Sequence, residues 1–327
     1  MLNRRRLIGL AASSLAAPSI LSSGAHAADW PAKPVRVVVP FTPGGSTDIT
    51  ARLVSNRLQE IWGQSVVVDN RPGAGGNIAA DAVAHSDPDG YTIFIVGPGL
   101  ATNQFLYPQL SYDPVRDFAP VTLLITQPNL MCVPISSVAK SVQEFIAYCN
   151  ANPGKVTYAS SGNGTTLHLS GELFKRLAKV EMIHIPYRGG APAINDLIPG
   201  RVDVIFDNMP SILPHAKAGS LRALAVTTKE RVAVVPEIPT IAESGVPGFD
   251  VFSWFGFFVP AKTSEGVIAK INADTNAALV HPSVKTRFEE LGANPKGSTP
   301  QELADFLKSE IDKWGPVIRE AKIRVEN

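Results

Sequence analysis

Four glycine-rich turns, arranged as two similar pairs, constrain the fold of this chain more than any other feature. The first pair lies at 43–48 and 73–77, and the second at 160–166 and 188–191. Each turn follows a strand-like apolar run and precedes a helical pattern. In α/β folds such turns lie at helix N-termini, where N–H groups point outward and the helix end carries about half a positive charge. Two such modules that face each other would form an anion clamp.

The first pair of turns belongs to a β-α-β-α-β pattern, which is half of a doubly wound sheet. Ser46, Thr47 and Asp48 are all good N-caps for the helix that follows the first turn, and we interpret Asp48 as a cap. Gly63 ends that helix. The expected strands are 35–39, 66–68 and 92–96, and the expected helices are 46–62 and 77–84.

The second pair of turns repeats this architecture without repeating the residues. We expect strands at 156–159, 182–185, 202–206 and 221–226, and helices at 167–177 and 191–198. Apolar stretches at 121–134 and 249–260 predict two long strands, and the pattern from 264 onward is helical. In that region Thr299 and Glu302 form a capping box with Pro300 at the first helical position.

The simplest topology for this pattern is an α/β protein of two doubly wound lobes joined by two crossing strands. The chain would cross near 125–133 and return near 250–259. We therefore predict a first lobe of residues 28–127 and 254–327 and a second lobe of residues 128–253. Two crossing strands between two lobes form a hinge with a cleft beside it.

The N-terminal segment 1–27 is typical of an export signal. Arg4, Arg5 and Arg6 precede the apolar run 7–21, and an A-x-A cleavage site ends at Ala27. A run of 15 residues interrupted by serines and a proline is too short to span a membrane of about 30 Å. We expect cleavage after Ala27 and a soluble periplasmic protein, exported by either the Sec or the twin-arginine route.

Charge and cysteine content narrow the function classes. The full chain has a net charge of +1, and loss of the three signal arginines makes it negative, so no basic field for nucleic acid exists. In an oxidising compartment Cys132 and Cys149 form either a disulfide or two buried free thiols, and both alternatives stay open.

The sequence carries none of the common motifs of nucleotide-binding, metal-dependent or serine-hydrolase enzymes. No turn carries the G-x-G-x-x-G fingerprint, no histidines have metal-ligand spacing, and no G-x-S-x-G elbow exists. Ser46, Ser160 and Ser161 have no evident base, so we expect no catalytic residue, cofactor or metal. His168 and His184 flank glycine turns, and we interpret them as packed or surface residues rather than ligand contacts.

Several segments together resemble the Bug family, the extracytoplasmic solute receptors of tripartite tricarboxylate transporters. The resemblance covers essentially the whole mature chain. It is carried by WPAKPVR at 30–36, PFTPGGSTD at 40–48, NRPGAGGN at 70–77, DGYT at 89–92, YRGGAP at 187–192, VDVIFD at 202–207 and PEIPTIAESG at 236–245.

The resemblance implies a periplasmic binding protein of Venus-flytrap form that delivers a small organic carboxylate to a membrane permease. The family implies binding by backbone amides and ordered water at two opposed loops, and we expect a monomer that is not an enzyme. Asp207 would either contact the ligand or bind loop amides. The residues expected to bind the ligand are Phe41, Gly44, Gly45, Ser46, Thr47, Asp48, Gly76, Asn77, Ser160, Ser161, Gly162, Asn163, Gly164, Thr165, Thr166, Gly190 and Asp207.

Alternatives remain at this point. One alternative is an exported hydrolase or transferase that uses the same cleft, and another is a sensing partner that shares the fold. The ligand itself stays open among aliphatic di- or tricarboxylates, amino acids and aromatic acids.

Overall fold

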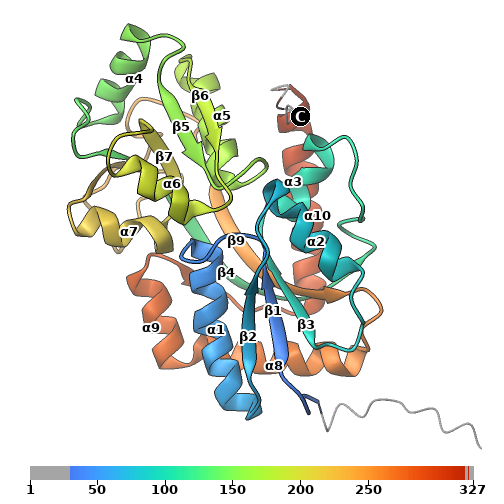
Figure 1. Ribbon diagram of the computed structural model, residues 1–327. Helices are drawn as coiled ribbons and strands as arrows, with labels where there is room; N and C mark the ends of the chain where they lie inside the picture. Colours follow the sequence, from blue (N-terminus) through green and yellow to red (C-terminus); the bar gives the residue numbers. More distant parts are fainter. Residues whose placement is uncertain (1–29, 321–322, 324–327) are drawn as a thin grey trace, which may run out of the picture.

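The structure is a computed structural model that describes residues 30–320 and residue 323. It has two α/β lobes, with the second lobe at the upper left of Figure 1 and the first lobe below and to the right. The expected signal segment 1–27 lies outside the described residues. Within the described part of the chain, every helix is too short or too polar to cross a membrane.

The first lobe is built on a parallel group of strands in the order β2-β1-β3, followed by the antiparallel β9. Buried valines of β1 pack against α1 and α8 in one apolar cluster. The strands are β1 (Val35–Val39), β2 (Val66–Asn70), β3 (Thr92–Val96), β9 (Phe252–Pro260) and the short β10 (Asn294–Pro295). The helices are α1 (Ser46–Trp62), α2 (Asn77–Ala84), α3 (Gly99–Leu106), α8 (Glu265–Val280), α9 (Pro282–Glu290) and α10 (Pro300–Glu320), with a 3-10 turn η2 (Ala74–Gly76) before α2.

The second lobe repeats the parallel arrangement in the order β7-β5-β6. Its core is rich in aromatic residues, among them Phe145, Phe174 and Phe206. The strands are β5 (Thr157–Ser160), β6 (Ile183–Pro186), β7 (Val204–Asn208) and β8 (Leu221–Val226). The helices are α4 (Val142–Ala151), α5 (Thr166–Ala178), α6 (Gly190–Leu197) and α7 (Met209–Lys217).

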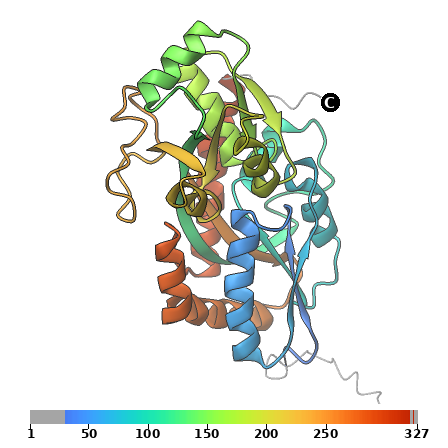
Figure 2. The same cartoon turned by 60° about the vertical axis from the view of Figure 1, so that its left-hand side comes forward.

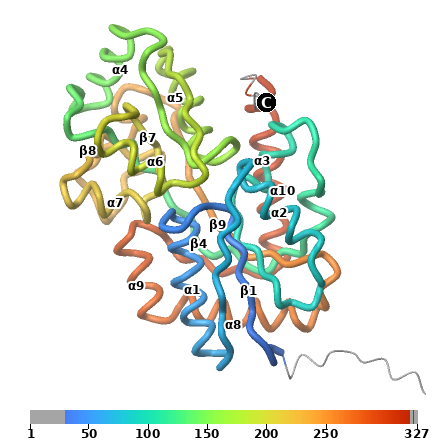
Figure 3. The backbone as a smooth tube through the Cα atoms, viewed as in Figure 1, coloured from blue at the N-terminus to red at the C-terminus, as the bar shows by residue number. Residues whose placement is uncertain are grey.

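The long strand β4 (Phe118–Pro134) runs from the first lobe into the second (Figures 2 and 3) and pairs with strands of both. From Phe118 to Pro128 it pairs with β9, and from Asn129 onward it pairs with β7 and β8. The chain therefore crosses between the lobes along β4 and returns just before β9, as expected. The lobe boundaries at 127/128 and 253/254 stay predictions.

Thr227 ties the two crossing segments together. Its N–H donates to the carbonyl of Asn129 at 3.0 Å, and its hydroxyl donates to the carbonyl of Val251 at 2.7 Å. The N–H of Val251 donates back to the carbonyl of Thr227 at 2.9 Å. A buried threonine thus bridges the two segments that connect the lobes.

The expected C-terminal helices form and cover the first lobe, but the last turns of α10 also reach the second lobe (Figure 1). Trp314 and Ile318 lie in the same buried cluster as Phe145 and Phe174. The expected capping box is confirmed, because the N–H of Glu302 donates to the Thr299 hydroxyl at 3.2 Å and the N–H of Thr299 donates to the Glu302 carboxylate at 2.7 Å.

The interpretation of Asp48 as an N-cap is wrong. Gly45 is the N-cap of α1, and its carbonyl already accepts the N–H of Ile49 at 3.0 Å. Asp48 lies in the first helical turn, and its carboxylate accepts the N–H of Gly44 at 2.9 Å. Asp48 therefore stabilises the turn that precedes α1 and does not cap the N-terminus of the helix.

Cys132 and Cys149 are both buried free thiols, which decides between the two alternatives. Burial, aided by the charge of Asp207, raises the pKa of Cys132 well above its usual value. Burial, with a contribution from Asp203, raises the pKa of Cys149 to about 12. Both thiols are therefore neutral and inert packing residues at ordinary pH.

Candidate functional site

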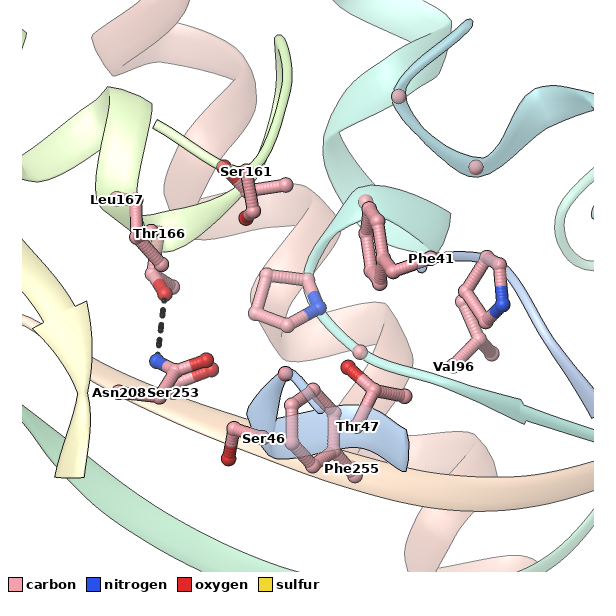
Figure 4. A pocket seen from close by; sticks show the side chains of 18 of the residues that line it. Phe41, Ser46, Thr47, Val96, Ser161, Thr166, Leu167, Asn208, Ser253 and Phe255 are labelled. Atoms are coloured by element: carbon pink, nitrogen blue, oxygen red, sulfur yellow. Dashed lines mark hydrogen bonds between the residues drawn. The ribbon is translucent and has the colours of Figure 1, made fainter. Parts of the chain in front are cut away.

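A pocket lies between the two lobes, where β1, β3, β5 and β7 end and helices begin (Figure 4). Ser46, Thr47 and Phe41 come from the first lobe, while Ser161 and Thr166 come from the second. In an α/β fold this is the usual place for a ligand.

Six helices begin at this pocket, and none has a side-chain cap hydrogen bond. The N-caps are Gly45 of α1, Gly76 of α2, Pro98 of α3, Thr165 of α5, Gly189 of α6 and Asn208 of α7. The first N–H groups of a helix have no partner within the helix. With no side-chain cap to accept them, and with the positive helix ends nearby, these groups suit an anion.

Most of the predicted site residues reach this pocket. The predicted residues that line it are Phe41, Gly45, Ser46, Thr47, Gly76, Ser161, Thr165, Thr166, Gly190 and Asp207. The predicted residues that are not among its lining residues are Gly44, Asp48, Asn77, Ser160, Gly162, Asn163 and Gly164. Members of this second group support those that line the pocket, as the contacts below show.

Asp48 and Asn77 position the first lobe's side of the pocket. Although burial opposes it, hydrogen bonds from Arg52, the Gly44 N–H and Asn70 hold the pKa of Asp48 below its usual value. Asn77 Oδ1 accepts from Asn103 Nδ2 at 2.6 Å and from the Tyr112 hydroxyl at 2.7 Å. Asn103 and Tyr112 in turn line the pocket.

The loop 160–166 is held from behind by stacked rings. His184 stacks on Tyr158 at 4.8 Å and on His168 at 4.3 Å between centroids. Gly164 N–H donates to His168 Nδ1 at 3.3 Å. Burial lowers the pKa of His168 to about 4 and that of His184 to about 3, so both rings are neutral packing groups, as the sequence interpretation favoured.

The expectation that Ser160 lacks a base is wrong. Its Oγ lies 2.6 Å from His184 Nε2. The two residues come from neighbouring parallel strands, with Tyr158 opposite His184 in register, so the pair is invisible in the linear sequence. Ser160 is completely buried and also accepts the N–H of Gly162, so this hydroxyl supports the loop instead of facing the pocket.

The lobes touch on both sides of the pocket through two hydrogen bonds, which we call the interlobe latch. The N–H of Thr42 donates to the carbonyl of Arg188 at 3.1 Å. The hydroxyl of Thr102 donates to the carbonyl of Gly164 at 2.9 Å. The latch joins the lobes in a closed arrangement around the pocket.

Asp207 is the one acidic side chain among the described residues that line the pocket, and none of those residues is Lys or Arg. It accepts the N–H of Asn208 at 2.8 Å and the hydroxyl of Ser211 at 3.0 Å. Burial raises its pKa to about 7 against these hydrogen bonds. Asp207 therefore binds a backbone amide, as one of the two sequence alternatives held, and ligand contact stays a prediction.

Sequence reasoning missed several lining residues. Helix α3 was not expected, although Gly97, Pro98 and Gly99 form a further glycine turn after the strand at 92–96 and could have signalled it. The aromatic side chains at the pocket are Phe41 and Phe255 together with Tyr112. The missed lining residues also include Leu100, Asn103, Leu167, Asn208 and Ser253.

A metal site does not emerge from this geometry. Within residues 30–320 and 323, no group of three or more His, Cys, Asp or Glu side chains is arranged to hold a metal ion.

Two α/β lobes, joined by crossing strands and closed over a pocket lined by helix N-termini, define a two-lobed solute-binding protein. Residues 50–323 match the model of the "Tripartite tricarboxylate transporter family receptor", and the chain belongs to this family. It is therefore a solute receptor of the Bug type, as the sequence resemblance implied.

Similar proteins cover the chain almost end to end. A Pseudomonas sp. (strain P51) protein, the "UPF0065 protein in tcbD-tcbE intergenic region", is 41% identical over 98% of this chain and 96% of its own length. BugT of Bordetella pertussis is 36% identical over 99% of this chain and 100% of its own.

Solved structures show the same fold. The R. palustris protein Rpa4515, solved with adipate, is 43% identical with a TM-score of 0.89, over 91% of this chain and 100% of its own. MatC from Rhodopseudomonas palustris, solved with malate, is 37% identical with a TM-score of 0.84, over 88% of this chain and 100% of its own.

Proposed function

We propose that this receptor captures a small organic carboxylate in the interlobe pocket and delivers it to the permease of a tripartite transporter. The observation that carries the proposal is the meeting of six helix N-termini without side-chain caps at one pocket that has no Lys or Arg among its described lining residues. Backbone N–H groups and hydroxyls would then replace the arginine found in many anion sites.

The first turns of α1 and α5 would hold one carboxylate. Ser46 and Thr47 begin α1, and Thr166 begins α5 on the opposite lobe. Hydrogen bonds to a charged group contribute about 1.5–3 kcal/mol each. A micromolar complex requires about 8 kcal/mol net of association costs, so several donors from both lobes must act together.

The rest of the ligand would lie against Phe41, Phe255 and the small residues around Gly76. Two similar proteins were solved with adipate and with malate, which differ in chain length and polarity. Such acids fit a pocket with polar helix ends and aromatic walls, and we take them as the first candidates for this chain.

A ligand that bridges both lobes would favour the closed arrangement over an open one. The permease would then recognise the closed receptor in the periplasm, after export and removal of residues 1–27. We expect the receptor to act as a monomer and without chemical change to the ligand. A hydrolase in the same cleft would be revealed by turnover of a bound acid.

Native mass spectrometry of protein purified without denaturation tests the proposal, followed by thermal shifts over a panel of carboxylates. A copurified small acid, or stabilisation by panel members, is the expected result. At a hundredfold excess over Kd, a ligand stabilises the folded state by about 2.7 kcal/mol, which is readily seen. Absence of any stabilisation across aliphatic, aromatic and amino acids contradicts the proposal.

A further inference from the structure

The acidic residue in the pocket creates an electrostatic conflict with the proposed ligand. Asp207 is only 2% exposed, and Cys132 beside it is completely buried. The described residues that line the pocket include no Lys or Arg to offset a second negative charge. Two carboxylates enclosed together at low dielectric cannot both stay ionised, and such pairs share one proton.

We propose that the ligand is bound together with one proton, which Asp207 and a ligand carboxylate share. The inference rests on the proposed function, because it concerns a carboxylate in the same pocket. Asp207 would then be a ligand-binding residue that donates a hydrogen bond to the acid, and affinity would fall as pH rises.

The geometry allows such a contact through Gly190. A Cβ placed on Gly190 would lie 3.0 Å from Asp207 Oδ2 and 3.2 Å from Oδ1, and both residues line the pocket. The missing side chain therefore leaves the carboxyl group uncovered on that side. Oδ1 accepts the N–H of Asn208, and Oδ2 accepts the Ser211 hydroxyl at 3.0 Å. That hydroxyl can donate instead to the Asn208 carbonyl at 2.9 Å, which frees Oδ2 to carry the proton.

The titratable thiol nearest to Asp207 does not change the charge at this carboxyl group. Cys132 on β4 is the titratable side chain whose pKa responds to the Asp207 charge, and its buried thiol remains neutral. Burial raises the pKa of Asp207 itself to about 7, so its carboxyl group is partly protonated at neutral pH. Other ionisable residues on the neighbouring elements are Tyr158 on β5, His168, Glu172, Lys175 and Arg176 on α5, Asp196 on α6, and His215 and Lys217 on α7.

Calorimetric titration of the exported protein tests the inference, with adipate, malate and the panel acid that stabilises it most. Binding at pH 8 should take up about one proton per ligand, measured in two buffers of different ionisation enthalpy. Affinity should fall roughly tenfold from pH 6 to pH 8 and roughly tenfold again from pH 8 to pH 9, because only the protonated pair binds. Proton uptake is read from the unaltered protein, so it does not depend on any variant folding.

Asp207→Asn should abolish both the proton uptake and the pH dependence, because its amide needs no proton to donate a hydrogen bond. Asp312→Asn, an exposed change on α10, should leave both unchanged. Ligand binding without proton uptake, or a pH dependence that survives in Asp207→Asn, overturns the inference. If no acid binds at any pH, the proposed function itself fails, and that result differs from binding that ignores pH.

Discussion

At the scale of single residues, burial decides what each polar side chain near the pocket does. Ser160 is the last residue of β5 and Asp207 is the last but one of β7, yet only Asp207 lines the pocket. Sequence placed both near the cleft because turns after parallel strands meet at one edge of a sheet. It could not show that His184 occupies the Ser160 hydroxyl, because that contact depends on strand register.

In the ligand-free protein, Asp207→Asn is expected to raise the unfolding temperature more at pH 8 than at pH 5. Burial raises the pKa of Asp207 from its usual 3.8 to about 7, so ionisation increasingly penalises the folded state as pH rises between these values and fully above 7. Asparagine avoids the charge and keeps an acceptor for the Asn208 N–H. Thermal unfolding at both pH values, with Asp312→Asn as control, checks this; an equal change at both contradicts the raised pKa.

At the scale of helices and strands, periodicity predicted most elements to within a few residues. The strands at 35–39, 92–96 and 221–226 are confirmed as β1, β3 and β8. Helices α3 and α7 were missed because glycine and proline, normally turn residues, stand at or near their starts. Both helices are short and depend on packing, which a local pattern does not contain.

Thr299→Ala should destabilise the protein by about 1 kcal/mol, because it removes the hydroxyl that caps α10. Ser264→Ala is a matched control, since Ser264 is the N-cap of α8 but makes no side-chain cap hydrogen bond. Urea unfolding of both variants measures the difference. Equal losses in the two variants would show that the capping box contributes nothing to stability.

Thr102→Val should weaken carboxylate binding roughly twofold to tenfold without unfolding the protein. The change removes the latch hydrogen bond to the Gly164 carbonyl, and one such bond contributes about 0.5–1.5 kcal/mol. Thr275→Val is the matched control, because its buried hydroxyl has no hydrogen-bond partner in the structure. Titration calorimetry compares the two; unchanged affinity in Thr102→Val means that the latch does not stabilise the closed, ligand-bound form.

At the scale of the whole molecule, the shared strand β4 and the bridge at Thr227 join two lobes that close over one pocket. The sequence predicted two lobes because its pattern repeats and two long apolar strands interrupt it. It did not predict the latch or the contact of α10 with the second lobe, since both join residues far apart in the chain. The proposed carboxylate clamp thus requires the closed pair of lobes, with the first turns of α1 and α5 on opposite sides of the pocket.

Calorimetric titration of the exported protein with an acid and with its neutral amide, such as adipate and adipamide, tests this clamp most directly. The acid selected by the carboxylate panel should bind one per protein with micromolar or tighter Kd, and its amide at least a hundredfold more weakly, because helix N-termini favour the anion. Equal affinity for acid and amide, or no binding of any acid, would contradict the account.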